Sequence, residues 1–469
     1  MNINPLERQL FVDDEIIKYS NNLQRKYYSP SRIGIVLQPD KPWELNCLIL
    51  YGSVVKDPFS GNLRMWYSSF SAKRGTGRDV LYAESTDGIH WNKPDVGIFE
   101  FGNSRHNNIV IPASHPGHPD CVNVIYDSGE RNKNKVYKMT CARRDINNEN
   151  FGIWTNFSPD GINWSGWKGP VLPGYGDRNT LMYDPELKKP YVIFTRPPDM
   201  MKHENFGKRI VVRLESSDFM KWKQSDIVLK PDLYDPLDIQ FYCLVAFRYE
   251  SMYLGFLQRL HSKEDWMDIE LISSRDSILW KRNGYRTAFM EPGFEKSLGC
   301  QWIGLSTNPP VEMDGQLFFF YEARNACHKL PRSSCFPAGV IGAAIMPKDG
   351  FASISSGFVP GELITKQFTC PGGKLCLNLN AANHIGFTEA GISAGGTRVE
   401  ILDQNQRPIT GFRLSDCIPL NGDYTGQKVE VEWKNRKNCN ILKGEKISLR
   451  FWLIHSDLYS FWFEPQGTK

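Results

Sequence analysis

The sequence has no apolar run near the about 18 residues needed to cross a membrane, so we expect no membrane contact. It has no Lys/Arg-rich run and a formal net charge of only +4, so we expect no nucleic-acid partner. Its 11 Cys stand at irregular spacings with no Cys-x-x-Cys pair, which argues against a zinc site. We therefore expect no metal and no cofactor, although a structural Ca²⁺ ion is compatible with the sequence.

The first residues, MNINPLERQLFVDDEII, lack the basic, apolar and small-residue regions of a signal peptide. Cys47, Cys141 and Cys243 stand in apolar, strand-like runs, where a buried thiol is the simplest interpretation. Both features favour a cytoplasmic, reducing location, or the periplasm or exterior if a leader has been removed.

What the chain does have is 13 Trp, 39 Gly and 29 Pro in 469 residues, which favours short strands and many turns. One pattern, Ser-x-Asp-x-x-x-Trp, begins at four serines: Ser85, Ser158, Ser216 and Ser274. A degenerate fifth copy, Lys348-Asp349-Gly350-Phe351, lacks the Trp. We expect each Asp to hold a tight turn and each Trp to pack between neighbouring sheets.

Each copy closes a unit with the same order of runs. Two strand-like runs come first, and a third short strand leads to the Asp turn. The first two runs span 47–70, 121–144, 179–196, 240–259 and 303–324. Five units of about four antiparallel strands predict an all-β fold with a five-bladed β-propeller at 1–360, its circle completed by an N-terminal segment including Gln9–Val12. A long β-sandwich, or two, is the alternative.

The stretch 361–469 breaks this period. Its alternating apolar and polar residues, separated by turn signals, predict a β-sandwich of seven or eight strands. The sandwich either binds carbohydrate or only packs against the propeller.

In a propeller, the residues before each inner strand converge at one mouth of the central channel. Most of those residues here are acidic, and the candidate catalytic residues are Glu44, Asp120, Asp177 and Asp238. Carboxylates around one funnel suit glycoside hydrolysis, in which one acid donates a proton and the other acts as base or nucleophile. For each residue, a structural role in a turn is the alternative.

The second strand-like run of each unit ends at the same mouth, and most of these runs end in arginine. The candidate substrate-binding residues from these run ends and their surroundings are Arg143, Arg178, Arg196, Arg259, Glu322 and Arg324. A ring of arginines would bind a carboxylate or sulfate on a sugar. The alternative is that each arginine neutralises a neighbouring acid.

Four further residues complete the candidate binding set. His106 and His118 stand in the loop before the second unit and would contact sugar hydroxyls or assist proton transfer. Trp43 and Trp302 flank the predicted mouth and would stack on a sugar ring, with core packing as the alternative.

Motifs along the chain resemble a group of bacterial glycosyl-hydrolase-like proteins with five-bladed propellers, akin to the invertase and arabinanase families. The motifs are LFVDDEII, PWE, MWYSS, YAESTDGIHWNKP, GDRNTLMYDP, RVEILD, ITGFRLSDC, LNGD and DLYSFWF, and the similarity covers roughly residues 9–465. In arabinanase-like enzymes three carboxylates act as base, pKa modulator and acid, which the resemblance places at Glu44, Asp120 and Asp177. The invertase motifs Asn-Asp-Pro-Asn-Gly and Arg-Asp-Pro are absent, which argues against fructosides. The Asp turns resemble sialidase Asp boxes.

The sequence thus predicts a glycoside hydrolase that acts on an oligo- or polysaccharide, with an acidic or sulfated glycan indicated by the arginines. A non-catalytic glycan-binding propeller is the main alternative, and a related lyase, phosphorylase or esterase is a third. The sequence does not indicate the oligomeric state.

Overall fold

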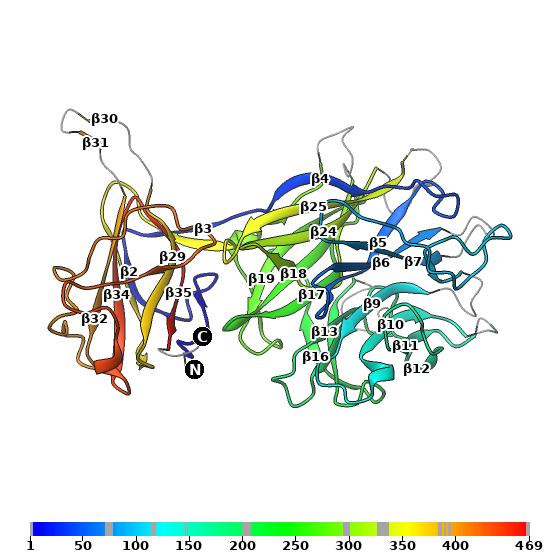
Figure 1. The fold of residues 1–469 in the computed structure, drawn as a ribbon, viewed down its shortest axis with the longest axis horizontal. Helices are drawn as coiled ribbons and strands as arrows, with labels where there is room; N and C mark the ends of the chain where they lie inside the picture. The colour runs from blue at the N-terminus through cyan, green and yellow to red at the C-terminus, as the bar shows by residue number, and fades with distance from the viewer. Residues whose placement is uncertain are drawn as a thin grey trace.

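The computed structural model describes residues 3–70, 78–113, 119–145, 147, 149–198, 208–293, 301–325, 337–382, 387–388, 391–392 and 395–465 (Figure 1). These residues form strands, turns and short 3₁₀ segments, with no α-helix among them. The all-β prediction is confirmed. No helix of the described chain is long and apolar enough to cross a membrane.

Five antiparallel sheets follow one another along most of the described chain, in the region drawn at the right of Figure 1. The first four each keep sequence order from the inner to the outer strand. The first sheet contains β5 (Leu48–Lys56), β6 (Leu63–Phe70), β7 (Arg78–Ser85) and β8 (Ile109–Ile111), and the second contains β9 (Asp120–Tyr126), β10 (Tyr137–Arg143), β11 (Gly152–Ser158) and β12 (Lys168–Pro173). The third contains β13 (Thr180–Tyr183), β14 (Tyr191–Thr195), β15 (Val211–Ser216) and β16 (Lys223–Leu229). The fourth contains β17 (Ile239–Tyr249), β18 (Met252–His261), β19 (Trp266–Ser274) and β20 (Trp280–Arg282), and β21 (Ala288–Met290) also pairs with β19.

The fifth sheet closes the circle. It runs β22 (Trp302–Leu305), β24 (Gln316–Arg324), β25 (Gly339–Pro347) and β4 (Ser31–Leu37), with β23 (Val311–Met313) also on β24. The inner strand β5 contacts both β9 and β22, so the first sheet lies between the second and the fifth. This is the arrangement of a propeller with its blades around a central channel. We refer to the five sheets as blades 1 to 5.

The strand that completes the circle is β4, which pairs with β25, and the expectation that Gln9–Val12 does so is wrong. Gln9 and Leu10 form β1 and pair with the C-terminal strand β35 (Asp457–Glu464) instead. The physical reason is burial: Phe11 is fully buried in the core of the sandwich, whereas β4 is mostly exposed, as an outer strand of a blade can be.

The Asp turns have the predicted construction. In the first copy, the amides of Ile89 and His90 both donate to Asp87 Oδ1 at 2.8 Å, and Gly88 donates to the Ser85 hydroxyl. The following Trp91 packs edge-on against Phe320 of blade 5, at 5.4 Å between ring centroids. The turn therefore fixes a tryptophan in the gap between two blades.

The degenerate fifth copy has become part of the contact with the sandwich. Asp349 is fully buried and accepts hydrogen bonds from Tyr249 of blade 4 and Ser460 of β35 at 2.9 and 2.6 Å. Arg8 forms an ion pair with the same carboxylate at 2.7 Å. Phe351 takes the packing role of the missing Trp, because its ring packs on Tyr249, Phe289 and Phe319.

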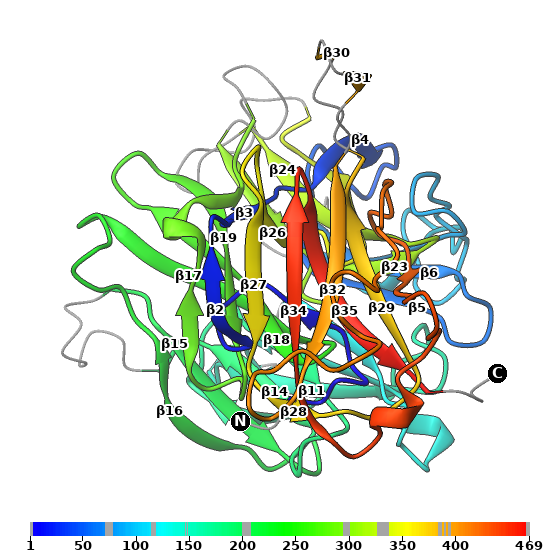
Figure 2. The same ribbon diagram turned by 90° about the vertical axis from the view of Figure 1, so that its left-hand side faces the viewer.

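The sandwich consists of two sheets that enclose a second apolar core (Figure 2). One sheet contains β1 (Gln9–Leu10), β3 (Gln24–Tyr27), β26 (Ala352–Ser355), β29 (Lys374–Asn380), β33 (Val429–Glu430) and β35; the other contains β2 (Ile17–Asn21), β27 (Gly361–Thr365), β28 (Phe368–Thr369), β32 (Gly396–Leu402) and β34 (Lys446–Ile454). A separate hairpin joins β30 (Phe387–Thr388) to β31 (Gly391–Ile392). By their sheet pairing, the strands β1, β2, β3 and β26 belong to the sandwich. The predicted boundary at 360/361 places these four strands with the propeller.

Candidate functional site

The candidate site lies where the inner strands begin, at one mouth of the channel. Asp120 is the first residue of β9, and Asp177 precedes β13 in the next blade. Both carboxylates are accessible, because their side chains are 31% and 51% exposed. Two accessible carboxylates on neighbouring blades are the basis of the site.

Asp120 forms an ion pair with Arg78, the first residue of β7. Burial raises the pKa of the Asp120 carboxyl, the charge of Arg78 opposes this, and the charge of Asp177 adds to the rise. The net effect is a pKa above that of an ordinary carboxyl.

Asp177 is shifted in the other direction. Burial acts to raise its pKa, but the charge of Arg196 at 2.9 Å and a 2.9 Å hydrogen bond from the Arg178 amide outweigh it. The pKa of Asp177 is therefore lowered, and the residue stays ionised. Two neighbouring carboxyls with pKa values moved apart form an acid and base pair.

Arg178 lies at the floor of this mouth and is 1% exposed. Its guanidinium lies 4.0 Å from the centroid of the Tyr51 ring and donates to Gln258 Oε1 at 3.1 Å and to the Leu305 carbonyl at 3.4 Å. These partners belong to blades 1, 4 and 5, while Arg178 itself precedes the inner strand of blade 3. Arg178 also donates to Cys121 Sγ of blade 2 at 3.8 Å, so it ties all five blades together near the channel axis.

Aromatic rings cover the walls around Arg178. The hydroxyls of Tyr51 and Tyr242 lie 3.0 Å apart, which joins the inner strands of blades 1 and 4. Arg324 lies over Tyr51 and Trp302, and Arg196 lies over Tyr242, at 4.8–5.1 Å from the ring centroids. Cation–π contacts of this kind fix guanidinium groups without neutralising them.

The mouth holds more positive than negative charge among the described residues. Five arginines face these carboxylates and tyrosines, against two accessible acids. The arginines are Arg78, Arg178, Arg196, Arg209 and Arg324, and the acids are Asp120 and Asp177. The Nε atoms of four of these arginines, Arg178, Arg196, Arg209 and Arg324, are buried without a hydrogen-bond partner. Buried donors without partners are costly.

Glu44 and Glu322 do not reach the mouth as a substrate-contacting pair would, because both are fully buried. Glu44 forms an ion pair with Lys93 at 2.8 Å and accepts from Tyr67 at 2.6 Å. Glu322 accepts from Arg324 at 2.6 Å and from the Leu50 amide at 2.9 Å. We reassign both from the candidate site to the interior of their blades, since their oxygens already have partners.

Asp238 and two of the predicted arginines also lie apart from the Asp120–Asp177 pair. Asp238 holds the β18–β19 turn, where its carbonyl accepts from Ser262. Arg143 lies between Trp154 and Trp167, at 5.0 and 4.9 Å from their ring centroids. Arg259 forms ion pairs with Asp268 and Glu270 within blade 4.

The predicted aromatic and histidine residues have other surroundings. Trp43 donates to Asn108 at 2.8 Å and packs edge-on against Phe101, and Trp302 is fully buried, so both pack in the core. His106 is exposed and contacts Asp95 at 3.1 Å. His118 lies outside the described residues.

Sequence reasoning missed Tyr51, Tyr242, Arg78 and Arg209. Arg78 and Arg209 stand at or just before the third strand of their blades. In an antiparallel blade, the third strand begins at the mouth where the second ends, so this position was available from the order of strands. The tyrosines carry no local signal, because they lie within apolar runs.

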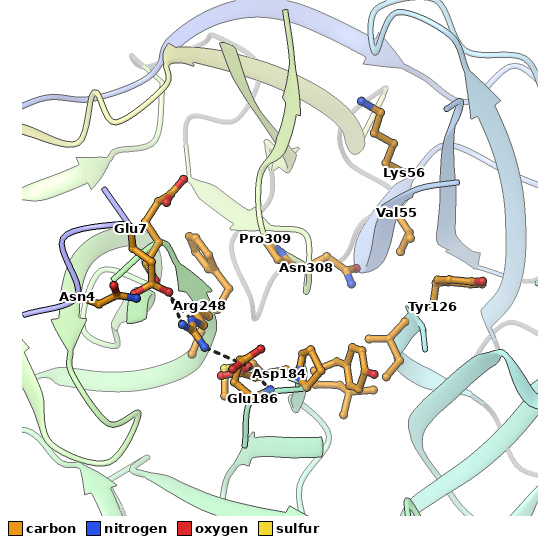
Figure 3. A pocket seen from close by; sticks show the side chains of 18 residues that line it. Asn4, Glu7, Val55, Lys56, Tyr126, Asp184, Glu186, Arg248, Asn308 and Pro309 are labelled. Carbon is orange, nitrogen blue, oxygen red and sulfur yellow. Dashed lines mark hydrogen bonds and ion pairs between the residues drawn. The ribbon is translucent and has the colours of Figure 1, made fainter. Parts of the chain in front are cut away.

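The opposite end of the channel holds a cavity of about 770 Å³ (Figure 3). Figure 3 shows Arg248 between Glu7 and Asp184, with Lys56, Tyr126 and Asn308 on the other side. Arg248 contacts Glu7 at 2.5 Å and Asp184 at 3.9 Å, so the N-terminal segment covers part of this opening. The ion pairs neutralise the carboxylates here, and the two mouths differ in character.

Among the described residues, no group of three or more His, Cys, Asp or Glu side chains is arranged to hold a metal ion.

Comparisons with known proteins give similarity only among solved structures. No family model matches the chain, and no curated protein matches it. A glycoside hydrolase is 15% identical with a TM-score of 0.49, covering 68% of this chain and 92% of its own. A glycosyl hydrolase from Bacteroides ovatus is 12% identical with a TM-score of 0.47, covering 73% and 97%. A fructofuranosidase from Schwanniomyces occidentalis, in complex with fructosylnystose, is 9% identical with a TM-score of 0.45, covering 93% and 98%. These names agree with the resemblance drawn from the sequence.

Proposed function

We propose that this chain hydrolyses a glycosidic bond in a glycan that carries an anionic group. The observation that carries the proposal is the pair Asp120 and Asp177, two accessible carboxyls whose pKa values are shifted in opposite directions. Glycoside hydrolysis needs one carboxyl that is protonated and one that is ionised.

The roles follow from the shifts. Asp120 retains its proton at higher pH than an ordinary carboxyl and donates it to the leaving glycosidic oxygen. Asp177 is held ionised by Arg196 and acts as base toward water or as nucleophile toward the anomeric carbon. Arg78 places the Asp120 carboxyl, because the two groups form an ion pair.

The anionic group is supported by the arginines. Their excess over the accessible acids favours a carboxylate or sulfate on the substrate.

The test is hydrolysis of a panel of aryl glycosides and acidic polysaccharides by the wild type and by Asp177→Asn. We expect turnover by the wild type and a loss of roughly 10²–10⁴-fold in the variant, with an unchanged circular dichroism spectrum. Asp238→Asn is the matched control, because it also alters a carboxylate before an inner strand but lies in a turn. Absence of turnover on every substrate, together with glycan binding, would replace this proposal by the glycan-binding alternative.

A further inference from the structure

A groove of about 780 Å³ lies outside the channel, between blade 4 and the sandwich. The sandwich contributes β2, β3 and the residues before them, and blade 4 contributes Tyr234 and residues 282–286. Most of its lining side chains are polar, with two exposed tyrosines, Tyr234 and Tyr285.

The backbone at Tyr285 has an unusual conformation. Gly284, Tyr285 and Arg286 all have positive φ, at 61°, 54° and 61°. A bulky residue rarely adopts this region, and such residues concentrate at ligand sites, where surrounding contacts hold them in place. The result is a Tyr285 side chain that is 102% exposed although its backbone is firmly held.

Contacts on two sides, with Asp232 and with Tyr27, hold the turn at residues 284–286. Arg286 makes two hydrogen bonds to the Asp232 carboxylate, at 2.7 and 2.6 Å. Gly284 packs so closely on Tyr27 of β3 that a Cβ atom there would meet the ring at 3.1 Å. The turn is thus fixed to its own blade by an ion pair and to the sandwich by packing.

Tyr234 forms the second part of the surface. It is 85% exposed, and the Arg286 guanidinium lies 5.4 Å from the centroid of its ring. Tyrosine presents a large, rigid, amphipathic face, and two of them at one polar groove leave apolar area in contact with water. A ligand with both apolar faces and hydroxyls would match this surface.

We infer that this groove is a second carbohydrate-binding site, which takes a stretch of oligosaccharide outside the catalytic channel. The C–H faces of pyranose or furanose rings would stack on Tyr234 and Tyr285. The Asp14 carboxylate, whose side chain is 81% exposed, would accept hydrogen bonds from sugar hydroxyls. The inference rests on the proposed function only in taking the ligand to be a glycan.

The test is affinity electrophoresis of the full chain through gels that contain arabinan, galactan, xylan or polygalacturonate. All variants carry Asp177→Asn, so that turnover does not consume the polysaccharide. We expect at least one polysaccharide to retard this chain, and Tyr285→Ala to weaken the apparent affinity about tenfold. Tyr285→Phe should keep it, because the phenyl ring still stacks. Phe358→Ala removes a sandwich aromatic that is 75% exposed and should change nothing.

Three results would overturn the inference. The first is no retardation by any of the polysaccharides, and the second is retardation that Tyr285→Ala and Tyr234→Ala leave unchanged. The third is a concentration-dependent dimer, seen by size-exclusion chromatography, that Tyr285→Ala dissolves, because the tyrosines would then form a contact between copies. Hydrolysis of small aryl glycosides by Tyr285→Ala with an intact Asp177 separates this site from the channel, since the groove variant should retain full activity on them.

Discussion

Arg196 lies 2.9 Å from the Asp177 carboxylate, and this ion pair accounts for the different behaviour of two carboxyls at one mouth. The charge of Arg196 is the largest influence that lowers the pKa of Asp177, against the effect of burial. Asp120 has its own arginine, Arg78, but burial and the neighbouring Asp177 charge prevail there. The same residue types therefore give opposite shifts, because the balance of burial and charge differs.

The first prediction concerns the pH profile. We expect kcat/KM to follow a bell-shaped curve. Activity falls at low pH as Asp177 gains a proton, below the ordinary carboxyl value of 3.8, because its pKa is lowered. Activity falls at higher pH as Asp120 loses its proton, above 3.8, because its pKa is raised. The measurement is kcat/KM against pH on a substrate without titratable groups.

The second prediction separates the two limbs. Arg196→Gln removes the largest lowering influence on Asp177, so its pKa rises and the acid limb moves to higher pH. Arg78→Gln removes the largest lowering influence on Asp120, so the alkaline limb moves to higher pH. Because Arg78 also lowers the pKa of Asp177, the acid limb should move in the same direction, by less than it does in Arg196→Gln. The profile of Asp238→Asn should match that of the wild type. If either arginine variant moved the other limb instead, the acid and base roles would have to be exchanged.

The third prediction concerns the anionic group. The Arg209 guanidinium lies over the Tyr242 ring and donates a hydrogen bond to Gln240, while its Nε atom has no hydrogen-bond partner. Arg209 also lacks a close carboxylate partner of the kind that Arg196 has in Asp177. Arg209→Gln should lower kcat/KM for an anionic substrate about 10- to 100-fold relative to a matched neutral one. The exposed Arg131→Gln serves as control. An equal loss on both substrates would show that Arg209 acts through the fold rather than through substrate charge.

The repeat pattern predicted the propeller well because Asp turns are local. Ser85 to Trp91 contain all the groups that form their turn, so the sequence alone indicates each blade. The closing strand β4 could not be found in this way, because it carries no Asp turn and lies in sequence far from its partner β25. Phe11 nearby is apolar, but its partner Phe461 is at the other end of the chain, and no local pattern reveals that pairing.

The site was predicted in part for the same reason. The rule that inner strands begin at one mouth placed Asp120 and Asp177 correctly near each other. It failed for Glu44, because the cation that neutralises it, Lys93, comes from a loop whose path the sequence does not indicate. It failed for Arg143, because side chains alternate along a strand and that residue packs against Trp154 and Trp167.

The fourth prediction tests the structural role of Glu44. In Glu44→Ala, Lys93 keeps Asp40 and the Gln38 carbonyl as partners, but the Tyr67 hydroxyl loses its acceptor and the buried lysine loses one of its two carboxylates. We therefore expect a loss of about 1–3 kcal/mol in the free energy of unfolding. Adding Lys93→Met should recover part of this loss, because the buried charge is then absent. Urea unfolding measures both, with Glu186→Ala as the exposed control, for which we expect a change within about 0.5 kcal/mol. A stable Glu44→Ala variant with no activity would return Glu44 to the catalytic candidates.

The last prediction compares two copies of one repeat. Asp87 and Asp349 stand at corresponding positions of the sequence repeat, but positive φ falls on Gly88 in the first copy and on Asp349 in the fifth. Asp87 is partly exposed, whereas Asp349 is buried against Ser460 and Arg8. Asp87→Ala should cost about 1 kcal/mol, the value of an ordinary turn hydrogen bond, while Asp349→Ala should cost about 3–5 kcal/mol, because Arg8 loses its buried partner. Urea unfolding followed by limited proteolysis measures the difference, and Asp349→Ala should expose the segment between propeller and sandwich to cleavage. Ser460→Ala combined with Asp349→Ala should cost less than the two single losses together, since both remove the same hydrogen bond. Equal losses for Asp87→Ala and Asp349→Ala would mean that the fifth turn contributes no more to the junction than an ordinary turn contributes to its blade.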